Sequence, residues 1–86
     1  MKVQKLPPIP SRQAEKFLSK LDSKTRNRVM DGIEKIPVGD IKPYKSNPEY
    51  LRLRVGDYRI LFKWFSNEQI FVSLIERRGQ VYKKGV

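Results

Sequence analysis

The chain has 86 residues, the size of one small domain, and we expect residues 1–86 to fold as one unit. It contains no cysteine and no histidine, which excludes disulfides, thiolate metal sites, cysteine nucleophiles and histidine acid–base catalysis. No apolar run approaches the ~20 residues of a membrane span, and the N-terminus lacks a signal-peptide core. We therefore expect a soluble, cytoplasmic domain that uses no cofactor and no metal.

The chain is strongly basic. Nineteen Lys and Arg residues against nine Asp and Glu residues give a net charge of +10. Such an excess attracts polyanions, nucleic acid first, although it also keeps a protein soluble, for which about 2–8 net charges suffice. Five of the eight arginines follow residue 50, whereas eight of the eleven lysines precede it. Because a guanidinium group binds phosphate as a planar fork, we expect the phosphate site in the second half.

The N-terminal third predicts a short strand and a first helix. Residues 1–6 can form the strand, which the prolines of the Pro7-Pro8-Ile9-Pro10 segment interrupt. From Ser11 onward, apolar residues recur with the 3–4 spacing of one helix face: Ala14, Phe17, Leu18 and Leu21. The proline segment itself suggests no function.

A second helix and a loop follow. Asp22 or Ser23 can cap the helix, and Pro37 ends it. Because the link between the helices is so short, we expect them to be antiparallel. Residues 37–49 hold three prolines and no periodicity, and we predict an irregular loop of the kind that often carries function.

The strongest local signal is a hairpin. Residues 51–55 and 58–64 alternate as strands do, and Gly56-Asp57 joins them as a tight turn. In this register one face is apolar and must cover the helices. The opposite face pairs Arg54 with Arg59, Arg52 with Leu61, and Tyr50 with Lys63.

Two arginines directly opposite each other repel in a sheet. The pairing of Arg54 with Arg59 therefore favours an anion bound between them, with Arg52 and Lys63 extending the same basic face. The alternative is that these arginines point into solvent or pair with carboxylates elsewhere in the chain.

A second hairpin turns near Ser66-Asn67 into a strand over residues 70–75. With a loop of two or four residues, the even positions of this strand share the face of Arg59, which places Glu76 beside Arg54 and Arg59 or one step beyond them. A three-residue loop would reverse this parity. The tail, residues 76–84, carries two arginines and a tyrosine, which suit phosphate binding and base stacking but also suit a solvated terminus.

These segments resemble a known family. Residues 52–62 (Arg-Leu-Arg-Val-Gly-Asp-Tyr-Arg-Ile-Leu-Phe) resemble the central hairpin of RelE/ParE-superfamily toxins of type II toxin–antitoxin pairs. Residues 76–82 resemble the closing motif of the family, a basic pair followed by a tyrosine. The resemblance covers nearly the whole chain. It implies an α+β fold: a small curved antiparallel sheet with an N-terminal antiparallel helix pair packed on one face.

The resemblance also implies a function. RelE-like members are endoribonucleases that cleave mRNA in the ribosomal A site, by attack of a 2′-hydroxyl on the adjacent phosphate, and so inhibit translation. ParE-like members share the fold but inhibit DNA gyrase, and a generic RNA-binding domain is a third reading. The RelE-like reading implies a ribosome and mRNA as partners and an acidic, RelB-like antitoxin, with the free toxin a monomer.

The resemblance and the residue pattern together give two groups of candidate site residues; the resemblance supplies Arg59, Arg52, Arg54, Lys45, Arg77, Arg78 and Tyr82. The catalytic group comprises Arg59, Arg52, Arg78, Tyr82 and Glu76. The group that binds mRNA or rRNA phosphate comprises Lys45, Arg54, Lys63, Arg77, Lys83 and Lys84. In this assignment Arg59, with Arg52 and Arg54, stabilises the phosphorane. Tyr82 or Glu76, or less favourably Lys45, accepts the proton, and stacking on the substrate base is an equally good role for Tyr82. Arg78 or Lys45 protonates the leaving oxygen.

The chain departs from the family pattern at two positions. Some nuclease members carry lysine where Tyr50 stands and a basic residue where Glu76 stands. Glu76 is therefore either a base or a salt-bridge partner.

Overall fold

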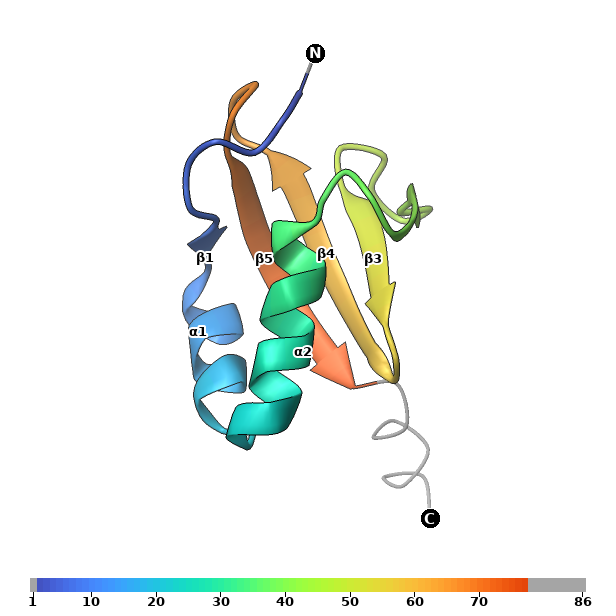
Figure 1. Ribbon diagram of the computed structural model, residues 1–86. Helices are drawn as coiled ribbons and strands as arrows, with labels where there is room; N and C mark the ends of the chain where they lie inside the picture. Colours follow the sequence, from blue (N-terminus) through green and yellow to red (C-terminus); the bar gives the residue numbers. More distant parts are fainter. Residues whose placement is uncertain (1, 78–86) are drawn as a thin grey trace.

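The computed structural model describes residues 2–77, in which two helices cover one face of a five-stranded sheet (Figure 1). The helices are α1 (Arg12–Ser19) and α2 (Ser23–Glu34). The strands are β1 (Ile9–Pro10), β2 (Asp40–Pro43), β3 (Leu51–Val55), β4 (Tyr58–Trp64) and β5 (Ile70–Arg77). Their order is β1-β5-β4-β3-β2. The predicted α+β architecture is confirmed, with one difference: β1 runs parallel to β5, so the sheet is mixed.

Both helices begin at short polar caps. Ser11 Oγ accepts a hydrogen bond from the Ala14 amide at 3.1 Å, and the Asp22 carboxylate accepts one from the Thr25 amide at 3.2 Å. Asp22, not Ser23, is therefore the cap of α2, and its hydrogen bonds from Thr25 lower the pKa of its carboxyl. The helices run antiparallel, as predicted (Figure 1). Neither is long and apolar enough to cross a membrane.

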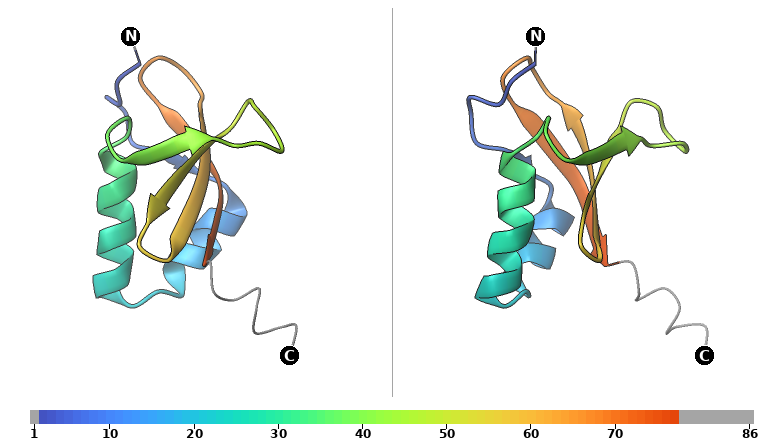
Figure 2. Two further views of the ribbon diagram at one scale, coloured as in Figure 1. Left: turned by 90° about the vertical axis from the view of Figure 1, so that its right-hand side faces the viewer. Right: turned by 45° about the vertical axis from the view of Figure 1, so that its right-hand side comes forward.

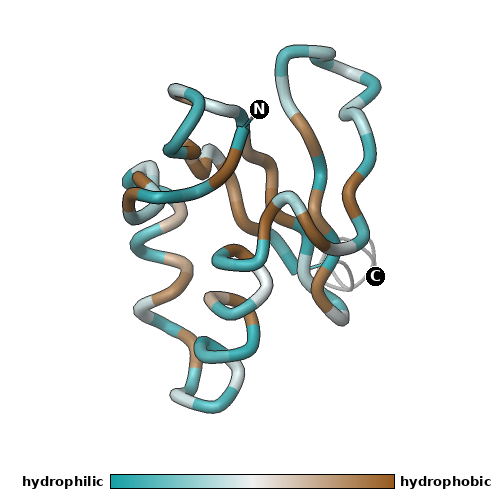
Figure 3. The backbone as a smooth tube through the Cα atoms, turned by 45° about the horizontal axis from the view of Figure 1, so that its top comes forward, coloured by the Kyte–Doolittle hydropathy of each residue, from teal (hydrophilic) through white to brown (hydrophobic). Residues whose placement is uncertain are grey.

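The core lies between the helices and the sheet. The strands combine apolar and polar residues (Figure 3), and Leu53, Ile60, Phe62, Ile70, Val72 and Ile75 of β3, β4 and β5 belong to this core. The buried side chains of this core are Ala14, Val29, Ile33, Ile36, Leu53, Ile60, Phe62, Ile70, Val72 and Ile75. The opposite face of the sheet carries the polar residues of the same strands together with Leu74 and the buried Leu61.

The β3–β4 hairpin has the predicted register. Val55 pairs with Tyr58, Leu53 with Ile60, and Arg54 with Arg59. Gly56 has a φ of +57°, and among the described residues only glycines have a positive φ. Glycine with positive φ at the first of two turn residues is typical of a type II′ turn, which matches the twist of antiparallel strands.

A β-bulge changes the predicted parity of β5. Glu76 pairs with Arg59 and Leu74 with Leu61, but Phe62 pairs with Val72, so that Ser73 is the extra residue. The even positions therefore share the face of Arg59 only beyond the bulge. Before it the prediction is wrong: Ile70 and Val72 are buried in the core.

The predicted N-terminal strand is also wrong. Val3 and Lys5 donate backbone hydrogen bonds to the carbonyls of Asn67 and Glu68, at 2.9 and 2.8 Å, but the strand forms at Ile9–Pro10. A proline is tolerated there because β1 is an edge strand.

The predicted loop of residues 37–49 is partly ordered. Residues 40–43 form β2, which pairs with β3 at the other edge of the sheet, so that Asp40 lies opposite Arg54 and Lys42 opposite Arg52. The edge position again explains the proline, Pro43, within a strand.

Two polar side chains attach α1 to the outer edge of β5 where β1 ends. Ser11 donates through its amide to the Val72 carbonyl at 2.8 Å and through its hydroxyl to the Ser73 carbonyl at 2.6 Å. The Gln13 side chain donates to the Ile75 carbonyl at 2.9 Å and accepts from the Ile75 amide at 3.0 Å. These contacts satisfy the backbone groups of β5 around the bulge.

We predict that Gly32→Ala destabilises the fold. A Cβ at Gly32 would lie 2.5 Å from Val55 Cγ2, and the cost of such overpacking, about 1–3 kcal/mol, exceeds the gain of about 1 kcal/mol in helix propensity. In a Val55→Ala background the clash is absent, so the same change should become stabilising. Urea unfolding of the unsubstituted protein, the two single variants and the double variant gives the change in unfolding free energy caused by Gly32→Ala in each background. A destabilisation that persists in the Val55→Ala background would contradict the close approach of α2 to β3.

Candidate phosphate-binding face

The face of the sheet turned away from the helices carries the predicted basic residues. Figure 2 shows the helices on one side of the sheet and the loop of residues 44–50 projecting on the other. We call this uncovered side the open face. From the strand register, its residues are Asp40, Lys42, Arg52, Arg54, Arg59, Leu61, Lys63, Phe71, Leu74 and Glu76.

Arg59 has a carboxylate partner. Its Nε donates a hydrogen bond to Glu76 Oε2 at 2.7 Å, and its Nη2 donates to the same oxygen. The two residues are strand partners, as the sequence predicted, and their side chains are 45% and 32% exposed. The pair explains how Arg54 and Arg59 can lie opposite each other, because Glu76 neutralises one of the two charges.

Arg52 is the most buried cation of the open face. Its side chain is 15% exposed, its Nη2 lies 4.0 Å from Asp40 Oδ1, and within residues 2–77 its buried Nη1 has no hydrogen-bond partner. An unsatisfied buried donor costs about 1–3 kcal/mol. A bound anion that reached Nη1 would supply the missing acceptor.

Lys63 is held at the far end of β4. Its Nζ donates to Glu49 Oε1 at 3.2 Å and lies 5.4 Å from the centre of the Tyr50 ring, which confirms the predicted neighbourhood of Tyr50 and Lys63. The hydrogen bond to Glu49 and the charge of that carboxylate raise the pKa of Lys63. Lys63 therefore carries its charge throughout the physiological pH range.

Arg54 and Lys45 are predicted cations that have no ion-pair partner among the described residues. Both are exposed, and in the described part of the chain neither has a carboxylate within 4.0 Å. Arg54 lies on β3 between its strand partners Arg59 and Asp40, whereas Lys45 belongs to the projecting loop (Figure 2). Within residues 2–77, Arg54 is thus a guanidinium at the centre of the open face that no carboxylate neutralises.

The structure does not bring all predicted residues together. Arg77 pairs with Tyr58 and lies over its ring at 6.0 Å, which places it on the helix side and not on the open face. The four tail residues Arg78, Tyr82, Lys83 and Lys84 lie outside the described residues.

The sequence reasoning missed Asp40, the ion-pair partner of Arg52, because residues 37–49 were expected to be irregular. The alternation in Asp40-Ile41-Lys42 was the available signal, since Ile41 pairs with the buried Leu53 and its neighbours face the other way.

Comparison with known proteins identifies the fold. No protein-family model and no curated protein matches the chain. A chain of the RelB-RelE antitoxin-toxin complex from Methanococcus jannaschii is similar in structure, with 23% identity and a TM-score of 0.66 over 88% of this chain and 96% of that chain. A chain of the archaeal RelE-RelB complex from Pyrococcus horikoshii OT3 is also similar, with 23% identity and a TM-score of 0.64 over 93% and 99%. The RelE-like fold implied by the sequence is thereby confirmed.

We predict that Arg59→Ala leaves the fold intact. The Arg59–Glu76 pair is solvent-accessible, and exposed ion pairs contribute about 0–1 kcal/mol, so the melting temperature should change little. Ile60→Asp, one residue further along β4, should unfold the domain because Ile60 is 0% exposed and an unpaired carboxylate would be buried. Circular dichroism melts of the two variants make the comparison. Equal destabilisation by both would show that the two faces are not as distinct as described.

Proposed function

We propose that this protein is the toxin of a type II toxin–antitoxin pair and a ribosome-dependent endoribonuclease that cleaves mRNA in the A site. The observation that carries the proposal is the placement of Arg52, Arg54 and Arg59 on adjacent strands of the sheet face that the helices leave uncovered. The RelE-like fold and the net charge of +10 support it.

The proposed chemistry is transfer of the phosphoryl group to the neighbouring 2′-oxygen. The 2′-oxygen bonds to phosphorus, the bond to the 5′-oxygen breaks, and the products are a 2′,3′-cyclic phosphate and a 5′-hydroxyl. One group accepts the 2′-proton and another supplies a proton to the 5′-oxygen. A guanidinium stays protonated at every pH that matters, so Arg52, Arg54 and Arg59 are suited to stabilise the dianionic phosphorane.

Glu76 competes with the substrate for Arg59. A phosphate that binds Arg59 through Nε and Nη2 must displace the Glu76 carboxylate, which now accepts hydrogen bonds from both atoms. The displacement is feasible because the pair is solvent-accessible and such pairs are weak. Once displaced, Glu76 would remain one strand away from the bound phosphate, within the region where a general base is needed. Tyr82, Arg78 and Lys45 stay candidates for the remaining proton transfers.

We propose an acidic, RelB-like protein as the antitoxin, and a monomeric toxin in its absence. The similar structures are complexes of RelE with RelB. An acidic segment laid over the open face would neutralise Arg54, which has no carboxylate partner among the described residues.

A second candidate is a ParE-like toxin that inhibits DNA gyrase without cleaving RNA. The observation that favours it is the Arg59–Glu76 pair, since Glu76 stands where some nucleases carry a basic residue. Toxicity with induction of the DNA-damage response and without mRNA cleavage would identify this function.

We predict that purified protein cleaves mRNA on programmed ribosomes much faster than free RNA, because the ribosome orients the 2′-oxygen for in-line attack. Arg59→Ala should lower the cleavage rate on ribosomes by about 10²–10³, as loss of one oxyanion donor does. Arg59→Lys should recover only part of the rate, because a point charge cannot bridge two phosphate oxygens. Primer extension measures the cleavage. A folded Arg59→Ala variant with full activity would refute the assignment.

We predict that Glu76→Gln separates the two roles of Glu76. If Glu76 is the general base, the substitution lowers the cleavage rate by about 10²–10⁴. If Glu76 only occupies Arg59, the amide releases the guanidinium, and both RNA affinity and cleavage rise. Single-turnover cleavage and RNA binding of the same variant distinguish these outcomes. An unchanged affinity together with an unchanged rate would show that the Arg59–Glu76 contact has no influence on the site.

A further inference from the structure

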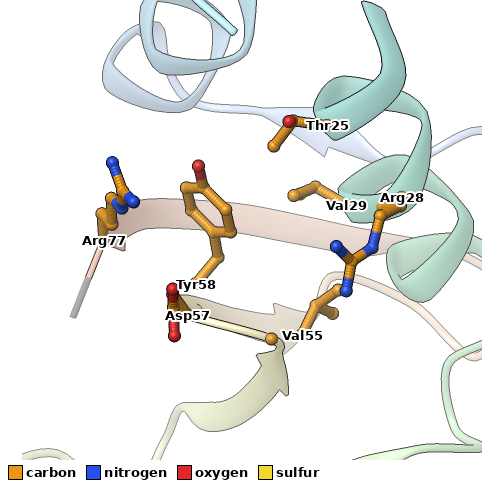
Figure 4. Close-up of a pocket in the computed structure, with 8 residues that line it drawn as sticks. Thr25, Arg28, Val29, Val55, Asp57, Tyr58 and Arg77 are labelled. Carbon is orange, nitrogen blue, oxygen red and sulfur yellow. The ribbon is translucent and has the colours of Figure 1, made fainter. Parts of the chain in front are cut away.

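A pocket of about 380 Å³ lies on the helix side of the β3–β4 turn (Figure 4). We call it the turn pocket. The first half of α2 supplies one wall, the turn residues supply the second, and Arg77 of β5 supplies the third. Its polar lining consists of Thr25, Arg28, Asp57, Tyr58 and Arg77, and Val29 and Val55 form an apolar base.

The polar groups of the turn pocket are held in place by packing. The Tyr58 ring packs edge-on against Phe17, with ring centres 5.9 Å apart, and Arg77 lies over it at 6.0 Å. Figure 4 shows the Tyr58 hydroxyl pointing into the space between Arg77 and Thr25. Arg28 reaches the turn itself, because a Cβ on Gly56 would lie 3.3 Å from Arg28 Nη2.

The turn pocket has an excess of positive charge. Among residues 2–77 no carboxylate lies within 4.0 Å of a nitrogen of Arg28 or Arg77. Asp57 is the one acidic residue of the lining. Two guanidinium groups, a phenol and a threonine hydroxyl therefore offer hydrogen-bond donors to an incoming anion.

The turn pocket and the open face are adjacent through the hairpin. Tyr58 and Arg59 are consecutive residues of β4, so their side chains point to opposite faces. Arg54 and Arg59 lie on the open face one residue from the turn, and Arg28 lies against the turn on the other side. A polyanion that extends from Arg54 and Arg59 around the β3–β4 turn would therefore reach Arg28 on the other side of Gly56.

We propose that the turn pocket binds a phosphate group of an RNA strand that continues from the open face around the β3–β4 turn. This proposal rests on the proposed function in one respect: it takes RNA to be the ligand of the open face. The donor set fits phosphate because guanidinium forks bind its oxygens in pairs. The Tyr58–Arg77 stack offers a flat surface for the attached base. RNA is favoured over an acidic peptide because one continuous backbone serves both sides of the turn.

The test is the salt dependence of RNA binding. A labelled single-stranded RNA of ten nucleotides is titrated with the full chain between 50 and 200 mM NaCl, and anisotropy gives Kd. Arg28→Ala should weaken binding and reduce the slope of log K against log salt by about 0.7, the loss of one phosphate contact. Tyr58→Phe should weaken binding without changing that slope, since it removes a donor but no charge.

Arg12→Ala is the matched control. Arg12 is an exposed arginine at the first position of α1 and is not part of the turn pocket, so it should leave the slope unchanged. A slope for Arg28→Ala equal to that of Arg12→Ala would overturn the proposal. So would a loss of affinity for an acidic antitoxin peptide with unchanged RNA binding, which would make the pocket a protein-binding site.

The outcome is independent of cleavage. If the protein cuts no RNA on ribosomes but Arg28→Ala still reduces the slope, the proposed function fails and the phosphate site stands. If the protein cleaves mRNA on ribosomes but Arg28→Ala does not change the slope, the proposed function stands and the phosphate site in the turn pocket fails. NMR locates the binding directly. Adding the RNA should shift the amide signal of Gly56, which lines the pocket, and this shift should be larger in the unsubstituted chain than in Arg28→Ala.

Discussion

The register of the β3–β4 hairpin is the constraint on which the other features depend. Because side chains alternate along a strand, a slip of one residue would move Leu53 and Ile60 out of the core and bring Arg54 and Arg59 into it. The positive φ of Gly56 permits the two-residue turn that sets this register. One turn thus determines the apolar face that the helices cover and the basic face that they leave free.

The bulge at Ser73 makes that arrangement compatible with β5. In a strand without a bulge, Ile70, Val72 and Glu76 would all point to the same face because all three are even positions. Glu76 would then lie in the core with Ile70 and Val72. The extra residue reverses the parity and puts Glu76 beside Arg59 on the open face. Ser11 and Gln13 occupy the backbone groups around the bulge, so the start of α1 helps to position the partner of Arg59.

The elements that could be predicted from sequence are those with a strong local signal. The hairpin follows from alternation around Gly56-Asp57, and the helices follow from apolar spacing and caps. β1 had no local signal and β2 only the short alternation of Asp40-Ile41-Lys42, because each is short, contains a proline and becomes a strand by pairing with a distant one. The bulge has no signature in the local sequence. The predicted facing of β5 residues was therefore wrong before the bulge and right after it. Of the site, the basic face was predictable, but its neutralisation by Asp40 and Glu49 depends on contacts between remote residues.

The ion pairs of the open face explain how a small domain can carry so many cations on one surface. Arg52, Arg59 and Lys63 each have a carboxylate at 4.0 Å or less, which reduces the repulsion that adjacent cations would otherwise cause. The carboxylates of the Arg59 and Lys63 pairs leave room for the proposed anion binding, because these two pairs are solvent-accessible and such pairs are weak. Arg54 has no such partner among the described residues and offers the first contact. In the proposed complex with RNA, each phosphate that also reached Arg52, Arg59 or Lys63 would compete with the carboxylate that pairs with that cation. A single small anion gains one such contact, whereas the proposed RNA ligand could make several at once, which would offset the competition.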